Sequence, residues 1–267
     1  MNDFAPHVTK KRFGQHFLHD KNILRRIVEY VAAKPGECLV EIGPGEGALT
    51  FLLLQATGRL TAIELDRDLI EPLRARAKGV GELTIVNRDV LEVDFSALAR
   101  DAGVSKVRLV GNLPYNISTP ILFHCLDHAG VIDDMHFMLQ KEVVERMAAG
   151  PGSKTYGRLS VMLQLRCSVE PLFDVPPTAF SPPPKVDSAV VRLVPLPAEK
   201  LPQTDFVAID RVVRAAFGQR RKTLGNALRQ VAGADDLAAA GIDARERAEQ
   251  LPPAAFVALA RVLESKN

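Results

Sequence analysis

Between residues 38 and 139, short apolar segments alternate with segments of helical periodicity, and this alternation constrains the fold more than any other feature. A strand that is apolar on both faces must be covered on both faces, and helices do this in a parallel sheet. The pattern therefore predicts an α/β fold with a largely parallel sheet. The predicted strands are Cys38–Ile42, Leu60–Glu64, Leu83–Asn87, Arg108–Gly111 and His136–Leu139, and the predicted helices between some of them are Ala48–Thr57, Asp68–Lys78 and Pro120–His128.

The two ends of the chain differ from this central part. Residues 1–20 are irregular and basic, and Asp20 is the predicted N-cap of a first helix. Two further strands are predicted at Ser160–Cys167 and Ala189–Leu193. The proline-rich stretch Pro176–Lys185 between them is predicted to be a loop, because proline cannot donate a hydrogen bond to a sheet.

After Leu196-Pro197 the strand pattern stops and only helical periodicity continues to the C-terminus. We therefore predict two domains, a mixed-sheet α/β domain over residues 1–199 and a small all-helical domain over residues 200–267.

A glycine-rich segment follows the first predicted strand and precedes a helix. Gly43, Gly45 and Gly47 lie in EIGPGEG, and Glu64 ends the second strand twenty-one residues after Gly43. Glycine permits a tight turn and close approach of a ligand, and a carboxylate at the end of the next strand can hold ribose hydroxyls. The spacing of the glycines is not that of a dinucleotide site, so it favours S-adenosylmethionine over the rival reading, an NAD-dependent oxidoreductase. Asp89, which follows the third strand, is predicted to bind the adenine amino group.

Asn112-Leu113-Pro114-Tyr115 closes the fourth predicted strand, on the sheet edge where ligands bind. The side-chain oxygen of Asn112 and the carbonyl of Leu113 could accept both hydrogens of an exocyclic amine and free its lone pair. Pro114 stiffens the segment, and Tyr115 offers a ring on which a base can stack. The tetrapeptide therefore predicts that an amino group on a planar base is presented to a methyl donor.

Several segments resemble the 16S ribosomal RNA adenine dimethyltransferases, within the wider rRNA adenine N6-dimethyltransferase family. They extend over most of the chain: FGQHFL at 13–18, EIGPGEGALT at 41–50, IELDRDL at 63–69, NLPYNISTP at 112–120, MHFMLQKEV at 135–143, YGRLSV at 156–161, PPPKVDSAVVRL at 182–193 and FGQRRKTLGNAL at 217–228.

The resemblance implies a Rossmann-like class I methyltransferase fold. It implies transfer of two methyl groups to N6 of each of two adjacent adenosines in a hairpin near the 3′ end of 16S rRNA, in the assembling small subunit. By motif, the cofactor contacts would be His16, Leu18, Gly43, Gly45, Glu64, Asp89 and Asn112. Residues Asn112–Tyr115 would grip the adenine, and Phe180 would be a second stacking aromatic.

His16 departs from the family, which often has asparagine there, so the cofactor contact at this position is open to question and pH dependence becomes possible. Two other functions stay open. One is a 23S rRNA adenine N6-methyltransferase, and the other is a ribosome-assembly or transcription factor that uses the fold to bind RNA. The segments at 182–193 and 217–228 favour the small-subunit enzyme, and intact Glu64, Asp89 and Asn112 favour catalysis.

The net charge is only +2, so the position of the basic residues matters more than their sum. Two basic runs are predicted to contact RNA phosphates, one near the N-terminus and one in the predicted helical domain. They are Lys10, Lys11 and Arg12, and Arg220, Arg221 and Lys222.

The remaining expectations concern what the sequence lacks. Its three cysteines are widely spaced and its histidine pairs have no third ligand, so we expect no disulfide framework and no metal site. No apolar run is long enough for a membrane helix. These features predict a cytoplasmic protein that acts away from membranes, and we expect it to be a monomer.

Overall fold

The computed structural model describes residues 16–219 and 221–266. The strands are β1 (Phe17–Leu18), β2 (Leu39–Ile42), β3 (Arg59–Ile63), β4 (Glu82–Val86), β5 (Val107–Asn112), β6 (Ile132–Gln140), β7 (Cys167–Val175), β8 (Phe180–Ser181) and β9 (Ser188–Pro195). The helices are α1 (Lys21–Val31), α2 (Thr50–Thr57), α3 (Ile70–Ala77), α4 (Phe95–Asp101), α5 (Ser118–Asp127), α6 (Lys141–Ala148), α7 (Arg158–Gln164), α8 (Phe206–Gly218), α9 (Leu224–Ala227), α10 (Ala234–Ala239) and α11 (Pro253–Glu264).

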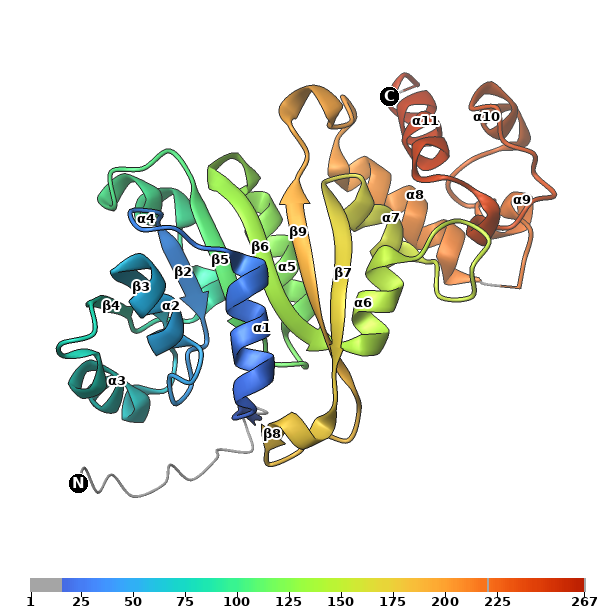
Figure 1. Cartoon of the computed structure of the whole chain (residues 1–267). Coiled ribbons are helices and arrows are strands. Elements are labelled where there is room, and N and C mark those ends of the chain that lie inside the picture. The colour runs from blue at the N-terminus through green and yellow to red at the C-terminus, as the bar shows by residue number, and fades with distance from the viewer. Residues whose placement is uncertain (1–15, 220, 267) are drawn as a thin grey trace. The chain divides into compact units, whose positions relative to one another are not determined.

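Seven strands form one mixed sheet in the order β4-β3-β2-β5-β6-β9-β7. The five strands from β4 to β6 are parallel, and β9 pairs antiparallel with β6. Helices cover both faces, with α1 in front of the sheet and α5 behind it in Figure 1. The predicted Rossmann-like α/β fold is confirmed. The order of the strands reverses at β2, so the carboxyl ends of β2 and β5 define the crevice in which ligands bind.

Helix α1 shows how the sequence fixes an element beside this crevice. The Asp20 carboxylate accepts hydrogen bonds from the backbone N–H groups of Asn22 (2.8 Å) and Ile23 (3.2 Å), which confirms it as the N-cap. Leu24, Ile27 and Val31 lie on the buried face of the helix and pack into the apolar core.

One predicted strand is wrong. Residues 158–164 form helix α7, in which five of the seven side chains are buried. The following segment, Cys167–Val175, is the strand instead, although it contains Pro171. It lies at the edge of the sheet, where one side of the strand has no neighbour among the described residues and a proline is tolerated. The predicted strand Ala189–Leu193 lies within β9, as expected.

The contacts divide the chain into two compact units. The first contains the residues up to Val144 together with Glu170–Pro195, and the second contains Glu145–Val169 together with the residues from Leu196 on. The second unit thus includes a central segment that the predicted boundary at residue 200 leaves in the first domain. Its core includes Tyr156, whose hydroxyl donates to the carbonyl of Leu251 (2.9 Å). No helix within residues 16–219 or 221–266 is long and apolar enough to cross a membrane.

Candidate active site

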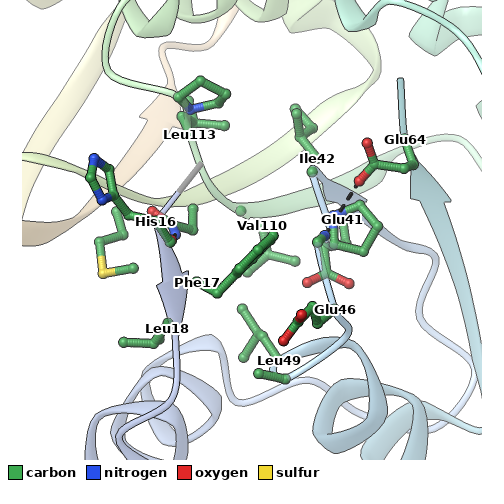
Figure 2. Close-up of a pocket in the computed structure, with 18 of the residues that line it drawn as sticks. His16, Phe17, Leu18, Glu41, Ile42, Glu46, Leu49, Glu64, Val110 and Leu113 are labelled. Carbon is green, nitrogen blue, oxygen red and sulfur yellow. Dashed lines mark hydrogen bonds between the residues drawn. The ribbon is translucent and has the colours of Figure 1, made fainter. Parts of the chain in front are cut away.

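A cavity of about 1210 Å³ lies at the carboxyl ends of the parallel strands. Its volume slightly exceeds the usual range for a single small-molecule site. Residues from the glycine-rich loop, from the ends of β3, β4 and β5, and from the segment around β1 line it. Figure 2 shows several of these side chains around the cavity, among them His16, Glu64 and Leu113. The structure therefore brings most of the residues predicted for a donor and an acceptor to one cavity.

The glycine-rich loop follows β2 and needs glycine for its backbone. Gly43 and Gly45 have φ angles of +71° and +56°, in the left-handed region that other residues rarely adopt. A Cβ atom on Gly45 would lie 3.0 Å from two ring atoms of Phe17. The loop is thus packed closely against the N-terminal strand β1, and Phe17 belongs to the cavity wall.

Glu64 and Asp89 follow β3 and β4, at the positions predicted from the sequence. The Glu64 carboxylate accepts hydrogen bonds from the backbone N–H groups of Asp66 (2.7 Å) and Gly45 (3.3 Å; Figure 2). Burial raises the pKa of Glu64. One oxygen of Asp89 accepts from the N–H of Leu91 (3.0 Å), and its other oxygen has no hydrogen bond within the described part of the chain. Both carboxylates keep acceptor capacity for a ligand.

Glu41 is a site residue that the sequence analysis did not single out. It is the last but one residue of β2, it lines the cavity, and only 2% of its surface is exposed. Burial raises its pKa to about 7, and the charge of Glu64 contributes. Its Oε2 atom has no hydrogen-bond partner among the described residues. A buried carboxyl that faces a cavity and has one oxygen without a partner suits a cationic ligand. Its place as the first residue of the glycine-rich motif is the sequence signal that could have indicated it.

Asn112 ends β5 and Leu113 follows it, in an orientation that leaves the side-chain oxygen of Asn112 and the carbonyl of Leu113 available. The Asn112 side-chain N–H donates to the carbonyl of His16 (3.0 Å), so its Oδ1 atom is the free end of the amide. The Leu113 N–H donates to the carbonyl of Met138 (3.1 Å), which fixes the peptide beside β6. Two acceptors therefore stand next to each other at the cavity, as the hypothesis of amine recognition requires.

Tyr115 is held from two sides. Its hydroxyl lies 2.6 Å from the hydroxyl of Ser188, a fully buried residue at the start of β9. Its ring stacks on the His16 ring, with 5.9 Å between centroids and 25° between planes. The His16 Nδ1 atom also hydrogen-bonds the Pro182 carbonyl (2.7 Å). His16 therefore joins the N-terminal segment, the tetrapeptide and the proline-rich loop around the cavity.

Phe180 does not occupy the place expected of a second stacking aromatic. It is only 2% exposed and packs in the apolar core with Leu18 and Leu24. Phe180 and Ser181 form strand β8, in which successive side chains point to opposite faces. Ser181 lines the cavity, so Phe180 points away from it into the core. A ring in this position cannot stack on a base without leaving the core.

Of the predicted RNA-contacting residues, two belong to the second unit and four fall outside the described residues. Arg221 and Lys222 are exposed in the second unit. Lys10, Lys11, Arg12 and Arg220 fall outside the described residues. Within the described part of the chain, no group of three potential metal ligands comes together.

Comparisons with known proteins agree on one family. Residues 7–265 match the model of a family described as ribosomal RNA adenine dimethylase. The ribosomal RNA small subunit methyltransferase A of Xanthomonas campestris is 60% identical to this chain over 262 residues, covering 98% of the chain and 99% of the relative. The protein of the same name in Xanthomonas oryzae is also 60% identical, with the same coverage.

Two solved structures have a similar fold over nearly the whole chain. A dimethyladenosine transferase from Plasmodium falciparum has a TM-score of 0.78 and 28% identity, with 91% of this chain and 96% of that chain covered. The 23S rRNA methyltransferase ErmE has a TM-score of 0.70 and 25% identity, with 93% and 99% covered. Both similarities extend beyond the sheet that class I methyltransferases share.

Proposed function

Because the chain belongs to the ribosomal RNA adenine dimethylase family, we propose that it dimethylates N6 of two adjacent adenosines in a 16S rRNA hairpin. The hairpin lies near the 3′ end of the RNA, the substrate is the assembling small subunit, and S-adenosylmethionine is the donor. The enzyme acts as a monomer in the cytoplasm. The observation that carries this proposal is that the acceptor tetrapeptide and the donor-binding carboxylates line one cavity.

The residues around the cavity suit this donor. Glu64 holds the ribose hydroxyls, Asp89 accepts from the adenine amino group, and the backbone of the Gly43–Gly45 loop approaches the ligand closely. Glu41 supplies the negative charge that a cationic amino-acid end or sulfonium requires. His16 and Leu18, which also line the cavity, cover the donor from the N-terminal side. When bound, S-adenosylmethionine supplies a methyl group on sulfur with a good leaving group.

The tetrapeptide positions the acceptor. Asn112 Oδ1 and the Leu113 carbonyl accept the two amine hydrogens, which pulls the nitrogen toward a tetrahedral geometry and frees its lone pair. Pro114 keeps these acceptors in place, and Tyr115 stacks on the base. No strong general base is needed, so positioning supplies most of the rate.

Positive charge holds the RNA outside the cavity. We assign this role to Arg220, Arg221 and Lys222, and to Lys10, Lys11 and Arg12. The exposure of Arg221 and Lys222 supports the first group.

Methyl transfer to purified ribosomal subunits tests the proposal. With labelled S-adenosylmethionine and unmethylated small subunits, label should enter adenines near the 3′ end of 16S rRNA, as mapped by mass spectrometry. Label confined to 23S rRNA would refute the proposed substrate. The Asn112→Ala variant should lose about 10²-fold or more in kcat and much less in donor affinity if Asn112 acts in the transition state. An equal loss in both would make Asn112 a donor-binding residue only.

A further inference from the structure

The exposed face of α1 carries positive charges and an aromatic ring that the proposed reaction does not use. Exposed side chains recur along this helix at the three- and four-residue spacing of one continuous surface. Three of them are cations and one is an anion. The six residues, which we call the α1 stripe, are Lys21, Asn22, Arg25, Arg26, Glu29 and Tyr30.

The cations of the α1 stripe are not neutralised. Lys21, Arg25 and Arg26 form no ion pair within residues 16–219 and 221–266. Other exposed arginines of the protein do: Arg74 pairs with Glu71 (2.9 Å). With Glu29 included, the α1 stripe carries three positive charges and one negative charge, and this net positive charge attracts an external anion.

One of these cations is held in place by aromatic rings. The Arg26 guanidinium lies 4.0 Å from the centre of the Phe173 ring and 5.9 Å from that of Tyr30, which is 43% exposed. A guanidinium stacked on a ring keeps its N–H edge free for a planar or tetrahedral oxyanion. A shallow depression of about 550 Å³ lies at the same place. Its lining residues all belong to the α1 stripe: Asn22, Arg25, Arg26, Glu29 and Tyr30.

The α1 stripe is continuous with the active-site cavity, because Lys21 and Arg25 also line that cavity. A strand whose target base enters the cavity must leave its adjoining phosphates at the cavity mouth. We infer that the α1 stripe binds the phosphate backbone of the RNA strand flanking the target adenosine. This inference rests on the proposed function, since it takes RNA as the substrate, and it identifies where the first unit holds that RNA.

Charge reversals on two helices test this inference. Arg26→Glu and Glu29→Lys change the α1 stripe in opposite directions. Glu71→Lys and Arg74→Glu on α3 are matched controls, because these residues are also exposed and three positions apart. The probe is a synthetic RNA of the 3′-terminal 16S rRNA hairpin with single-stranded flanks, and its Kd is measured at several salt concentrations.

We expect Arg26→Glu to weaken binding about tenfold at low salt and to lower the salt slope by about 1. Glu29→Lys should tighten binding and raise the slope. Both α3 variants should stay within about twofold of the original protein. Thermal unfolding of each variant checks that it is folded under the conditions in which its Kd is measured.

Equal effects from the two helices, or shifts in the same direction from both α1 variants, would overturn the inference. Methyl transfer to unmethylated small subunits separates this failure from failure of the proposed function. If the original protein methylates the small subunits while the α1 variants bind the hairpin RNA unchanged, only the inference on the α1 stripe is wrong. If the original protein binds the hairpin RNA through the α1 stripe but does not methylate the small subunits, the proposed reaction is wrong.

Discussion

Two buried carboxyl groups, Glu41 and Glu64, face the same cavity, and their surroundings differ. Glu64 accepts two backbone hydrogen bonds, whereas one oxygen of Glu41 has no partner among the described residues. A protein keeps such a group at the expense of stability, and this is common where charge is needed for binding. The buried charge of Glu41 therefore lowers the stability of the empty protein, and a cationic ligand in the cavity would offset this loss.

Glu41→Gln should make the protein more stable at pH 8. The pKa of Glu41 is about 7 in the folded protein and 4.5 without burial, so its contribution to stability falls as pH rises from about 4.5 to 7. Glutamine at this position should raise the free energy of unfolding by at most about 3 kcal/mol at pH 8 and change it little at pH 4. Thermal unfolding at both pH values measures the difference.

The same variant should bind S-adenosylmethionine more weakly, with an affinity that no longer rises between pH 6 and 8. Calorimetric titration of both proteins checks this. An unchanged Tm at pH 8 would mean that Glu41 is not strained by burial.

The hydrogen bond between Tyr115 and Ser188 should matter for turnover more than for donor binding. Ser188→Ala leaves the half-buried phenol without its partner and loosens the ring on which the base stacks. We expect kcat to fall about tenfold, with unchanged affinity for S-adenosylmethionine. Tyr115→Phe should have a similar effect, and the double variant should be no worse than either single one. Additive losses would show that the two hydroxyls act independently.

Between elements, a charged network holds α1 against the sheet. Arg108 on β5 donates to Asp134 on β6 (2.8 and 3.0 Å), to Glu37 (2.7 Å) and to the carbonyl of Val31 at the end of α1 (2.7 Å). Arg192 on β9 also contacts Asp134 (3.3 Å). Hydrogen bonding to Arg108 helps to hold the pKa of Asp134 below its usual value, despite burial. The helix that borders the cavity is thus joined to three strands.

Arg108→Met should destabilise the first unit strongly. It would leave Asp134, which is buried, without its main partner, and breaking a buried ion pair costs about 3–5 kcal/mol. Lys106→Ala is the control, because Lys106 makes only a loose exposed pair with Asp133 (3.9 Å). Urea unfolding should show a large shift for the first variant and almost none for the second. Similar midpoints would contradict the role of the network.

The elements that the sequence predicted well are those with one clear pattern. Strands of the parallel sheet read as apolar runs because both of their faces are buried, and the ends of β2 to β5 placed Gly43, Glu64, Asp89 and Asn112 correctly at the cavity. Helix α7 was predicted as a strand because it is buried on several sides, which removes the polar face that marks a helix.

Other errors depend on neighbours that are distant in the sequence. Strand β7 was missed because its edge position, and not its own residues, makes Pro171 acceptable. The direction of the Phe180 side chain depends on the pairing of β8 with β1, some 160 residues away in the chain. No local pattern contains that pairing, so the family motif alone misplaced this ring.

For the molecule as a whole, the chain passes three times between its two units. Residues 145–169 leave the first unit, and the chain returns to it for Glu170–Pro195 before its C-terminal part begins. Binding groups for RNA are proposed in both units, at the α1 stripe and at Arg221 and Lys222. The affinity for RNA should therefore depend on both units, and the salt dependence should report the sum of their contacts.

Arg221→Ala with Lys222→Ala should weaken RNA binding and reduce the salt slope by about 1 to 2. The control is Arg214→Ala with Arg245→Ala, which removes the same charge from arginines that already pair with Asp210 (3.4 Å) and Asp243 (2.9 Å). Filter binding with the hairpin RNA measures both. An equal change in slope would mean that only net charge matters.

The short sheet formed by β1 and β8 has a consequence for measurement. Among the described residues, this sheet consists of Phe17 and Leu18 paired with Ser181 and Phe180, and the neighbouring N–H of His19 donates to the Ala179 carbonyl (3.0 Å). We expect so short a pairing to open more often than the central sheet and its amide hydrogens to exchange faster with solvent deuterium. A ligand that fills the cavity beneath His16 and Phe17 would slow this exchange. Deuterium uptake at these few amides should therefore report whether the donor site is occupied, without any modification of the protein.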